Sequence, residues 1–111
     1  MPNEGRPTIS THVLDTGTGQ PAAGVRVLLI RGGDGHDWTG VLTDTRTDED
    51  GRVRDLLGGR SLEPGSYRLE FVLGDGFFRA LSVWLDVVDV SRSYHVPLLR
   101  SAFGLTTYRG S

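Results

Sequence analysis

The sequence predicts an all-β protein, built as a sandwich of two packed antiparallel sheets with about eight strands and at most one short helix. Its 111 residues include 16 Gly and five Pro, which divide the chain into short segments. Several of these segments alternate between apolar and other side chains, as half-buried strands do. Short alternating segments separated by turn residues are typical of a β-sandwich and not of a helical fold.

The length suits a single domain, which is predicted to span 8–111 after a loose leader at 1–7. Hydrophobic residues make up 37% of the chain and charged residues 23%, as in ordinary globular proteins. A core of this size is small, and this favours association between copies of the chain.

The first predicted strand covers 8–15, where the side chains alternate between two faces. One face carries Ile9, Thr11 and Val13, and the other carries Ser10, His12 and Leu14. Gly and Pro then mark a turn at 16–21. The next strand is predicted at 25–30, before a Gly-rich turn at 32–35. The apolar face of this strand carries Val25, Val27 and Leu29.

The middle of the chain begins with a polar strand at 41–47, which we expect near a sheet edge. The acidic turn 48–51 leads into a short strand at 52–54. The strand 67–73 shows the clearest alternation in the sequence. Its apolar positions are Tyr67, Leu69, Phe71 and Leu73.

The last part of the chain contains three further predicted strands, at 81–90, 94–99 and 106–108. Residues 77–80, which precede the first of them, are compatible with one helical turn.

Composition excludes several classes of chemistry. The chain has no Cys, so disulfides, thiolate nucleophiles and Cys-ligated zinc are impossible. All 12 cationic side chains are Arg, so Schiff-base catalysis and a P-loop lysine are excluded as well. The net charge of −2, without a basic cluster, argues against a nucleic-acid partner.

The sequence also lacks targeting signals that we would recognise. No apolar run is long enough to cross a membrane, so we expect no membrane partner. The first seven residues lack the apolar core of a signal peptide. We therefore expect the protein in the cytoplasm.

The three histidines are the first candidates for acid–base chemistry. His12 and His95 lie in predicted strands, where a His is more often structural than catalytic. His36 lies in a Gly-rich turn and is expected to be solvated. Arg52 follows the acidic turn and, by itself, looks like a solvated strand end.

Other local motifs give weaker evidence for a catalytic or cofactor site. The sequence has no G-x-S-x-G nucleophile elbow, and the G-T-G at 17–19 lacks the third Gly of a dinucleotide fingerprint. His12 and His95 have no nearby second ligand such as H-x-H, so no metal site is predicted.

The C-terminal residues are unusual for a chain end, which is commonly frayed and polar. An apolar, strand-like run at 94–99 is followed by a final aromatic residue, a cation, a Gly and a hydroxyl. These are Tyr108, Arg109, Gly110 and Ser111. We expect this end to dock against the fold.

Three motifs together carry a family resemblance: S-T-H-V-L-D at 10–15, Y-H-V-P-L-L at 94–99 and Y-R-G-S at 108–111. In this order they resemble the 5-hydroxyisourate hydrolases, a transthyretin-related family of purine degradation. The resemblance covers most of the chain. It implies a transthyretin-like sandwich and a homotetramer, a dimer of dimers with its active sites in a central channel.

The resemblance also assigns roles to residues. It makes His12 and His95 the two catalytic histidines. Arg52, which ends a T-D-x-D-G-R segment at 47–52, would line the substrate site. The four C-terminal residues, Tyr108, Arg109, Gly110 and Ser111, would reach the channel in a supporting role. No cofactor is implied.

The implied function is hydrolysis of 5-hydroxyisourate to 2-oxo-4-hydroxy-4-carboxy-5-ureidoimidazoline, a small-molecule reaction of urate degradation. One of the two histidines would act as general base, and the sequence does not select which. A guanidinium suits a planar, oxygen-rich substrate because it offers a rigid fork of donors.

Two alternative functions are also considered, one suggested by departures from the family pattern and one by the fold. The connection at 74–93 is shorter than in typical members and lacks their F-x-P-E motif, Arg100 replaces an apolar residue, and 103–105 is varied. These departures are compatible with a divergent hydrolase or cyclase of another small heterocycle. The other alternative is a non-catalytic, transthyretin-like protein that binds a small ligand. Transthyretin lacks these histidines and the Y-R-G-S end, so the residues favour an enzyme.

Overall fold

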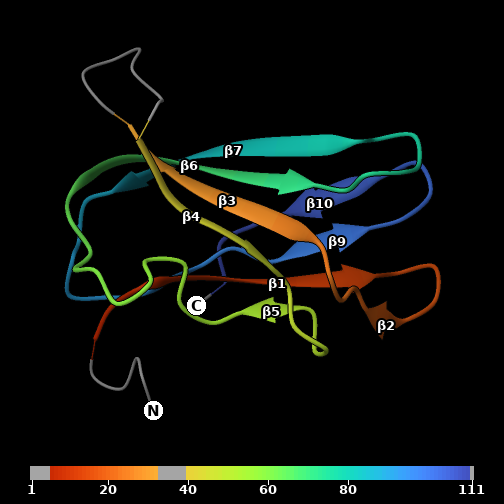
Figure 1. The fold of residues 1–111 in the computed structure, drawn as a ribbon, viewed down its shortest axis with the longest axis horizontal. Coiled ribbons are helices and arrows are strands. Elements are labelled where there is room, and N and C mark those ends of the chain that lie inside the picture. The colour runs from red at the N-terminus through yellow and green to blue at the C-terminus, as the bar shows by residue number, and fades with distance from the viewer. Residues whose placement is uncertain (1–5, 33–39, 111) are drawn as a thin grey trace.

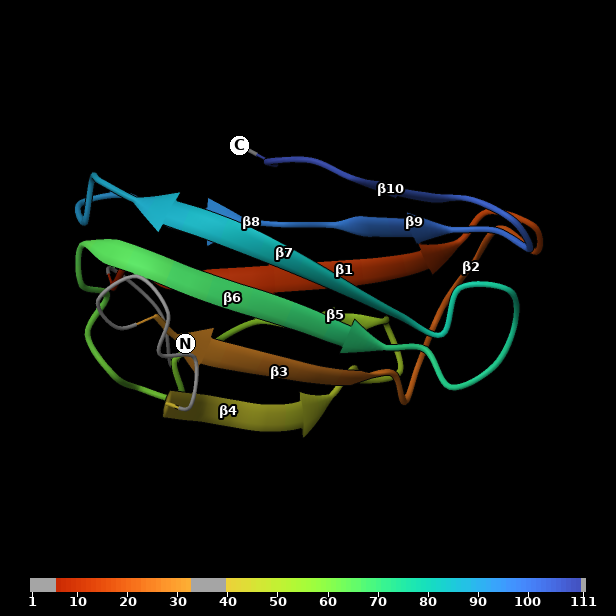
Figure 2. The same cartoon turned by 90° about the horizontal axis from the view of Figure 1, so that it is seen from above.

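The computed structural model describes residues 6–32 and 40–110. Within these ranges the chain forms ten strands and no helix, arranged as two facing layers (Figures 1 and 2). The predicted all-β sandwich is therefore confirmed. No helix in the described part of the chain is long and apolar enough to cross a membrane.

The two layers contain six and four strands. The six-stranded sheet consists of β1 (Ile9–Asp15), β2 (Gln20–Pro21), β5 (Arg52–Val53), β8 (Tyr94–His95), β9 (Leu98–Arg100) and β10 (Leu105–Thr107). The four-stranded sheet consists of β3 (Arg26–Arg31), β4 (Gly40–Arg46), β6 (Gly65–Val72) and β7 (Ala80–Val87). The strands outnumber the expected eight because β2, β5 and β8 are only two residues long.

β1 is the centre of the six-stranded sheet and pairs with four other strands. β2 and β5 run antiparallel to it, whereas β8 and β9 run parallel to it. The parallel pairs differ from the purely antiparallel sheets that the sequence predicted. They arise because the chain crosses from β7 in the other layer before it enters β8, so β8 is not joined to β1 by a hairpin.

The predicted strand at 94–99 is divided into β8 and β9 at Val96 and Pro97. Pro97 has no N–H to donate to a strand ladder, so the ladder is interrupted there. Two side chains bind the carbonyl groups at the break: Thr11 Oγ1 donates to Val96 at 2.6 Å, and Thr107 Oγ1 donates to Pro97 at 2.8 Å.

The four-stranded sheet is antiparallel throughout and has the order β4-β3-β6-β7. β4 lies at an edge, as the polar sequence predicted. The helical turn considered at 77–80 is wrong, because residues 77–79 belong to an irregular connection and Ala80 begins β7. β7 also ends three residues before Val90, since the amides of Val88 and Asp89 donate to the hydroxyl of Tyr94.

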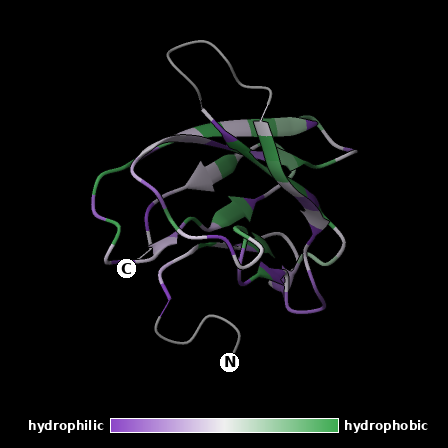
Figure 3. Cartoon of the chain, turned by 60° about the vertical axis from the view of Figure 1, so that its left-hand side comes forward, coloured by the Kyte–Doolittle hydropathy of each residue, from purple (hydrophilic) through white to green (hydrophobic). Residues whose placement is uncertain are grey.

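The core lies between the layers, on the faces that the alternation predicted. The fully buried side chains include Ile9 and Val13 of β1, Val27 and Leu29 of β3, and Leu69 and Phe71 of β6. Figure 3 shows that the strands carry both hydrophobic and hydrophilic residues. The other face of each sheet points away from this core. On β1 that outer face carries Ser10, His12 and Leu14.

The three segments expected to depart from the family pattern lie at one end of the sandwich. Arg100 Nη2 lies 3.4 Å from a carboxylate oxygen of Asp75, in the short connection between β6 and β7. The ring of Phe77, in the same connection, lies 5.9 Å from the ring of Phe103. Arg100 and Phe103 therefore both contact the connection between β6 and β7.

The acidic turn before β5 sets the position of Arg52. The Asp48 carboxylate accepts hydrogen bonds from the amides of Asp50 at 2.8 Å and Arg52 at 3.0 Å. These bonds favour the ionised form, and the pKa of Asp48 is lowered mainly by the one from Arg52. Gly51 then joins the turn to β1, because its carbonyl accepts from the Val13 amide at 2.7 Å.

Position 51 requires glycine for two reasons, its backbone conformation and the lack of space for a side chain. Its φ is +74°, a left-handed conformation that costs other residues energy. A Cβ at this position would lie 2.4 Å from the Val13 carbonyl oxygen. Gly19 has a similar φ of +73°, but a Cβ there would meet nothing within 4 Å.

We predict that Gly51→Ala lowers the free energy of unfolding by about 2–4 kcal/mol, since backbone strain and a clash combine. Gly19→Ala is the matched control and should cost only about 1 kcal/mol, from the backbone conformation alone. Urea unfolding at one protein concentration measures both. Equal losses for the two variants would show that contact with β1 is not the reason for Gly51.

Candidate active site

The candidate active site lies on the outer face of the six-stranded sheet. Alternation along β1 directs Thr11 and Val13 into the core and leaves His12 on the opposite face. On the neighbouring strands, the same alternation buries Tyr94 and Leu98 and leaves His95 half-buried. The face that the core does not use therefore collects the polar side chains.

Strand pairing brings His12 and Arg52 together. They are direct partners in the antiparallel pair of β1 and β5. Residues that face each other in such a pair lie on the same side of the sheet, with their Cβ atoms about 5 Å apart. Their separation of 40 positions in the sequence is thus closed by the register alone.

His95 reaches the same face from the opposite edge of β1. It pairs with Ser10 in the parallel pair of β1 and β8. The Ser10 Oγ lies 2.8 Å from His95 Nδ1, within hydrogen-bond distance. Since Ser10 precedes His12 by two positions on β1, the three predicted residues His12, Arg52 and His95 converge on one region.

Two adjoining hollows occupy this face. One, of about 400 Å³, is lined by His12, Leu14, His95, Pro97, Leu99, Tyr108 and Gly110. The other, of about 530 Å³, is lined by His12, Leu14, Pro21, Asp50, Arg52 and Arg54. They share His12 and Leu14, so His12 stands between the site of His95 and that of Arg52.

Burial and nearby cations change the acid–base behaviour of His95. Its pKa is lowered, first by burial, then by the positive charge of Arg52 and by His12. A charged imidazole is unfavourable in such surroundings. His95 is therefore neutral near pH 7 and has a nitrogen lone pair that can accept a proton.

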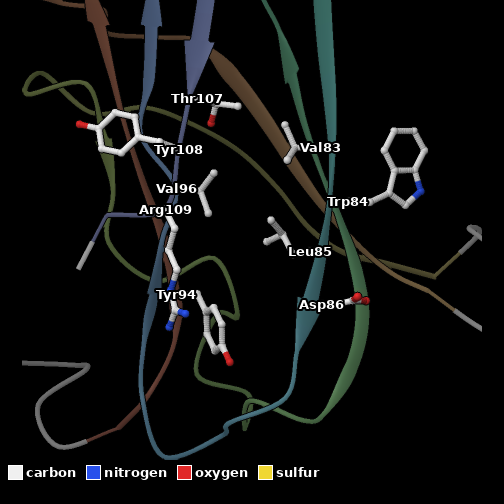
Figure 4. Close-up of a pocket in the computed structure, with 9 residues that line it drawn as sticks. All are labelled: Val83, Trp84, Leu85, Asp86, Tyr94, Val96, Thr107, Tyr108 and Arg109. Atoms are coloured by element: carbon white, nitrogen blue, oxygen red, sulfur yellow. The ribbon is translucent and has the colours of Figure 1, made fainter.

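The C-terminal residues divide between the two sides of the six-stranded sheet. Gly110 is bound to His95 through its amide, which donates to the His95 carbonyl at 2.7 Å, and Tyr108 lines the same hollow. Arg109 points the other way and stacks over the ring of Tyr94 at 4.4 Å (Figure 4). Ser111 lies outside the described residues, as does the predicted solvated His36.

The groove that contains Arg109 is separate from the histidines. It has a volume of about 330 Å³ and lies between β7 and the C-terminal segment, where Val83 and Leu85 face Val96 (Figure 4). Neither His12 nor Arg52 lines it. Arg109 would therefore support the site through its contact with Tyr94, because it does not line the hollow that contains His95.

Several residues of the site were not singled out by the sequence. Ser10 and Leu14 share a face with His12, so the alternation of β1 was the signal that could have found them. Pro97 and Leu99 form an apolar part of the wall. Among the described residues, no cluster of three or more His, Asp or Glu side chains could hold a metal ion.

This arrangement supports a definite kind of chemistry. A neutral imidazole can take a proton from water, and a guanidinium can stabilise negative charge on an oxygen. Leu14, Pro97 and Leu99 offer apolar surface to a flat ring. The site fits hydrolysis of a small, planar, oxygen-rich molecule.

Comparison with known proteins gives consistent matches. The sequence profile of the HIUase/Transthyretin family matches residues 9–110. The 5-hydroxyisourate hydrolase of Caulobacter vibrioides is 45% identical, over 93% of this chain and 97% of that protein.

Solved structures give the same fold. The 5-hydroxyisourate hydrolase of Klebsiella pneumoniae superposes with a TM-score of 0.79 at 31% identity, over 95% of this chain and 99% of that one. Sea bream transthyretin in complex with thyroxine superposes with a TM-score of 0.83 at 25% identity, over 92% of this chain and 93% of that one.

We predict that His95 titrates below about 6.5, the usual value for imidazole. The groups that face it are His12 on β1, Arg52 on β5 and Tyr108 after β10. NMR of the imidazole C–H signals against pH measures the midpoint. Arg52→Gln should raise the midpoint, because one cation is removed, yet leave it below the usual value, because burial has the largest effect.

The control for this titration is Arg26→Gln, on the four-stranded sheet, where the guanidinium pairs with Asp44 at 2.7 Å. It should leave the His95 midpoint unchanged. A midpoint at or above the usual value in the unaltered protein would contradict the neutral state of His95.

Proposed function

The chain belongs to the HIUase/transthyretin family, and we propose that it hydrolyses 5-hydroxyisourate to 2-oxo-4-hydroxy-4-carboxy-5-ureidoimidazoline without a cofactor. The observation that carries this proposal is the convergence of His12, Arg52 and His95 on one hollowed face. Relatives named for this activity are similar over nearly their whole length.

The reaction adds one water molecule across a ring C–N bond. Water attacks a cyclic carbonyl carbon, which becomes the carboxylate of the product. The bond from that carbon to nitrogen breaks, and the nitrogen becomes the end of the ureido group. The protein must therefore take a proton from water, stabilise a developing oxyanion and return a proton to the departing nitrogen.

We assign the general base to His95. Its lowered pKa keeps the imidazole unprotonated at neutral pH, as a base requires. His12, on the border between the two hollows, is placed to give a proton to the departing nitrogen. Arg52 offers its fork of donors to the oxygen that becomes negative.

The C-terminal residues support this site. Tyr108 and Gly110 form part of its wall. Arg109 holds the C-terminal segment against Tyr94 by stacking. Ser111 would contribute its hydroxyl or its terminal carboxylate to orient the substrate.

The position of the departures from the family favours the standard substrate. Arg100 pairs with Asp75, and the ring of Phe77 lies beside the ring of Phe103, at the end of the sandwich. None of them lines either hollow around His12. A divergent hydrolase or cyclase would need altered walls, and the described walls come from the parts of the chain that match the family.

The second alternative, a non-catalytic protein that binds a small ligand, is less well supported. Sea bream transthyretin, a structural neighbour, was solved with thyroxine. The hollow in this chain instead contains a neutral imidazole, held beside a second imidazole and a guanidinium. A carrier of an apolar ligand has no need of that combination.

We also propose a homotetramer, a dimer of dimers, in which the outer faces of the six-stranded sheets border a central channel. The hollows open on that face, so a second copy facing it would enclose them. Enclosure would exclude bulk water and strengthen the electrostatic effects of Arg52. The proposed location is the cytoplasm, on the sequence alone.

We predict a particle with four times the chain mass, since the small core and the open catalytic face both favour association. Light scattering over a dilution series in the micromolar range measures it. A monomer throughout that range would exclude an enclosed channel.

We predict that His12→Ala, Arg52→Ala and His95→Ala each reduce turnover by about 10² or more, because each removes acid–base or oxyanion chemistry. Decay of freshly generated 5-hydroxyisourate, followed by ultraviolet absorbance, measures turnover. His36→Ala and Arg26→Ala are controls and should be nearly silent. Near-normal turnover in both His12→Ala and His95→Ala would reject the mechanism.

A further inference from the structure

We propose that Ser10 and Gly110 are positioning residues that hold the His95 ring in one orientation and one tautomer. Ser10 would bind Nδ1, and the missing side chain at 110 would leave space for the opposite edge of the ring. The inference rests on the proposed function, since it explains how His95 serves as its base.

The contact from Ser10 connects two rigid strands. Ser10 and His95 are partners in the pair of β1 and β8, and their side chains meet at 2.8 Å. On either side of His95 the backbone is fixed to β1, because Tyr94 donates to the Thr8 carbonyl at 2.8 Å and Val96 to the Ser10 carbonyl at 2.9 Å. The hydroxyl therefore approaches Nδ1 from a fixed position.

The contact from Gly110 comes from the other side. Its amide donates to the His95 carbonyl, which closes an isolated bridge between the two residues. A Cβ at 110 would lie 2.7 Å from His95 Cδ2 and 3.3 Å from Cγ. Gly110 does not have a positive φ, so lack of space, and not backbone conformation, requires glycine here.

Together these contacts cover both lateral edges of the imidazole. Nδ1 and Cδ2 flank Cγ on opposite sides of the ring. With Ser10 at the first and Gly110 at the second, neither contact covers the edge formed by Cε1 and Nε2.

A serine hydroxyl can donate or accept, and the proposal assigns the donor role in this pair to Nδ1–H. When Nδ1–H donates to the Ser10 oxygen, Nε2 carries the lone pair. This is the form that a base needs if it is to take a proton from water in the hollow. The same arrangement gives a physical reason for the Ser of the first motif and the Gly of the last one.

The test compares Ser10→Ala and Gly110→Ala with controls in the full-length protein. Ser82→Ala is the control for Ser10, because Ser82 is also a half-buried strand serine whose hydroxyl binds a side chain, Glu70, at 3.2 Å. Gly40→Ala is the control for Gly110, because a Cβ there would come no closer than 3.5 Å to another residue. Circular dichroism and particle size verify folding.

The first readout is the ¹⁵N NMR signature of the His95 tautomer in the resting protein. We expect Nδ1–H in the unaltered protein, a mixture of tautomers in Ser10→Ala, and restoration in Ser10→Thr, which keeps the hydroxyl. Gly110→Ala should shift the ring signals of His95. Neither Ser82→Ala nor Gly40→Ala should change them.

The second readout is turnover of 5-hydroxyisourate. Ser10→Ala and Gly110→Ala should each lower kcat by about 10-fold or more with little change in KM, as expected when a group that orients a catalytic residue is lost. Ser10→Thr should recover most of the kcat.

If Gly110→Ala does not fold, the same substitution is made together with His95→Ala, which removes the clashing ring. That double variant should fold, and its failure would overturn the role of Gly110.

An unchanged tautomer and kcat in Ser10→Ala would overturn the role of Ser10. The tautomer is measured without substrate, so a wrong substrate assignment would leave the NMR results intact and abolish only the turnover signal.

Discussion

β1 is the element on which both the fold and the candidate active site depend, because its edges are hydrogen-bonded to strands from distant parts of the chain. One edge receives β5, which carries Arg52, and the other receives β8, which carries His95. His12 belongs to β1 itself. The register of these two strand pairs brings the three candidate catalytic side chains together. A slip of one residue would send them to the core face.

The division of β1 into two faces explains how a small core and a polar site coexist. Thr11 and Val13 are buried between the layers, whereas His12, which lies between them in the sequence, is on the opposite face of the sheet. His95 is still partly buried, next to Arg52 and His12, and its pKa is lowered. The same sheet therefore stabilises the fold on one side and keeps a neutral base on the other.

The expected departures from the family pattern lie in a region that does not line the two hollows around His12. Arg100 and Phe103 each contact the connection between β6 and β7, at the end of the sandwich. A change in this connection is therefore accommodated locally. Neither hollow around His12 is lined by Arg100, Phe103 or the connection.

The sequence by itself determined the all-β class and the inward faces of the main strands, and through its motifs it predicted His12, Arg52 and His95 as site residues. These are local properties, because alternation and motif spacing are written in neighbouring residues. Only the tertiary structure decided that β8 and β9 run parallel to β1, that Arg109 turns to Tyr94, and that Ser10 and Gly110 border His95. Pairing between residues 85 positions apart depends on which strands become neighbours, and local patterns do not encode this choice.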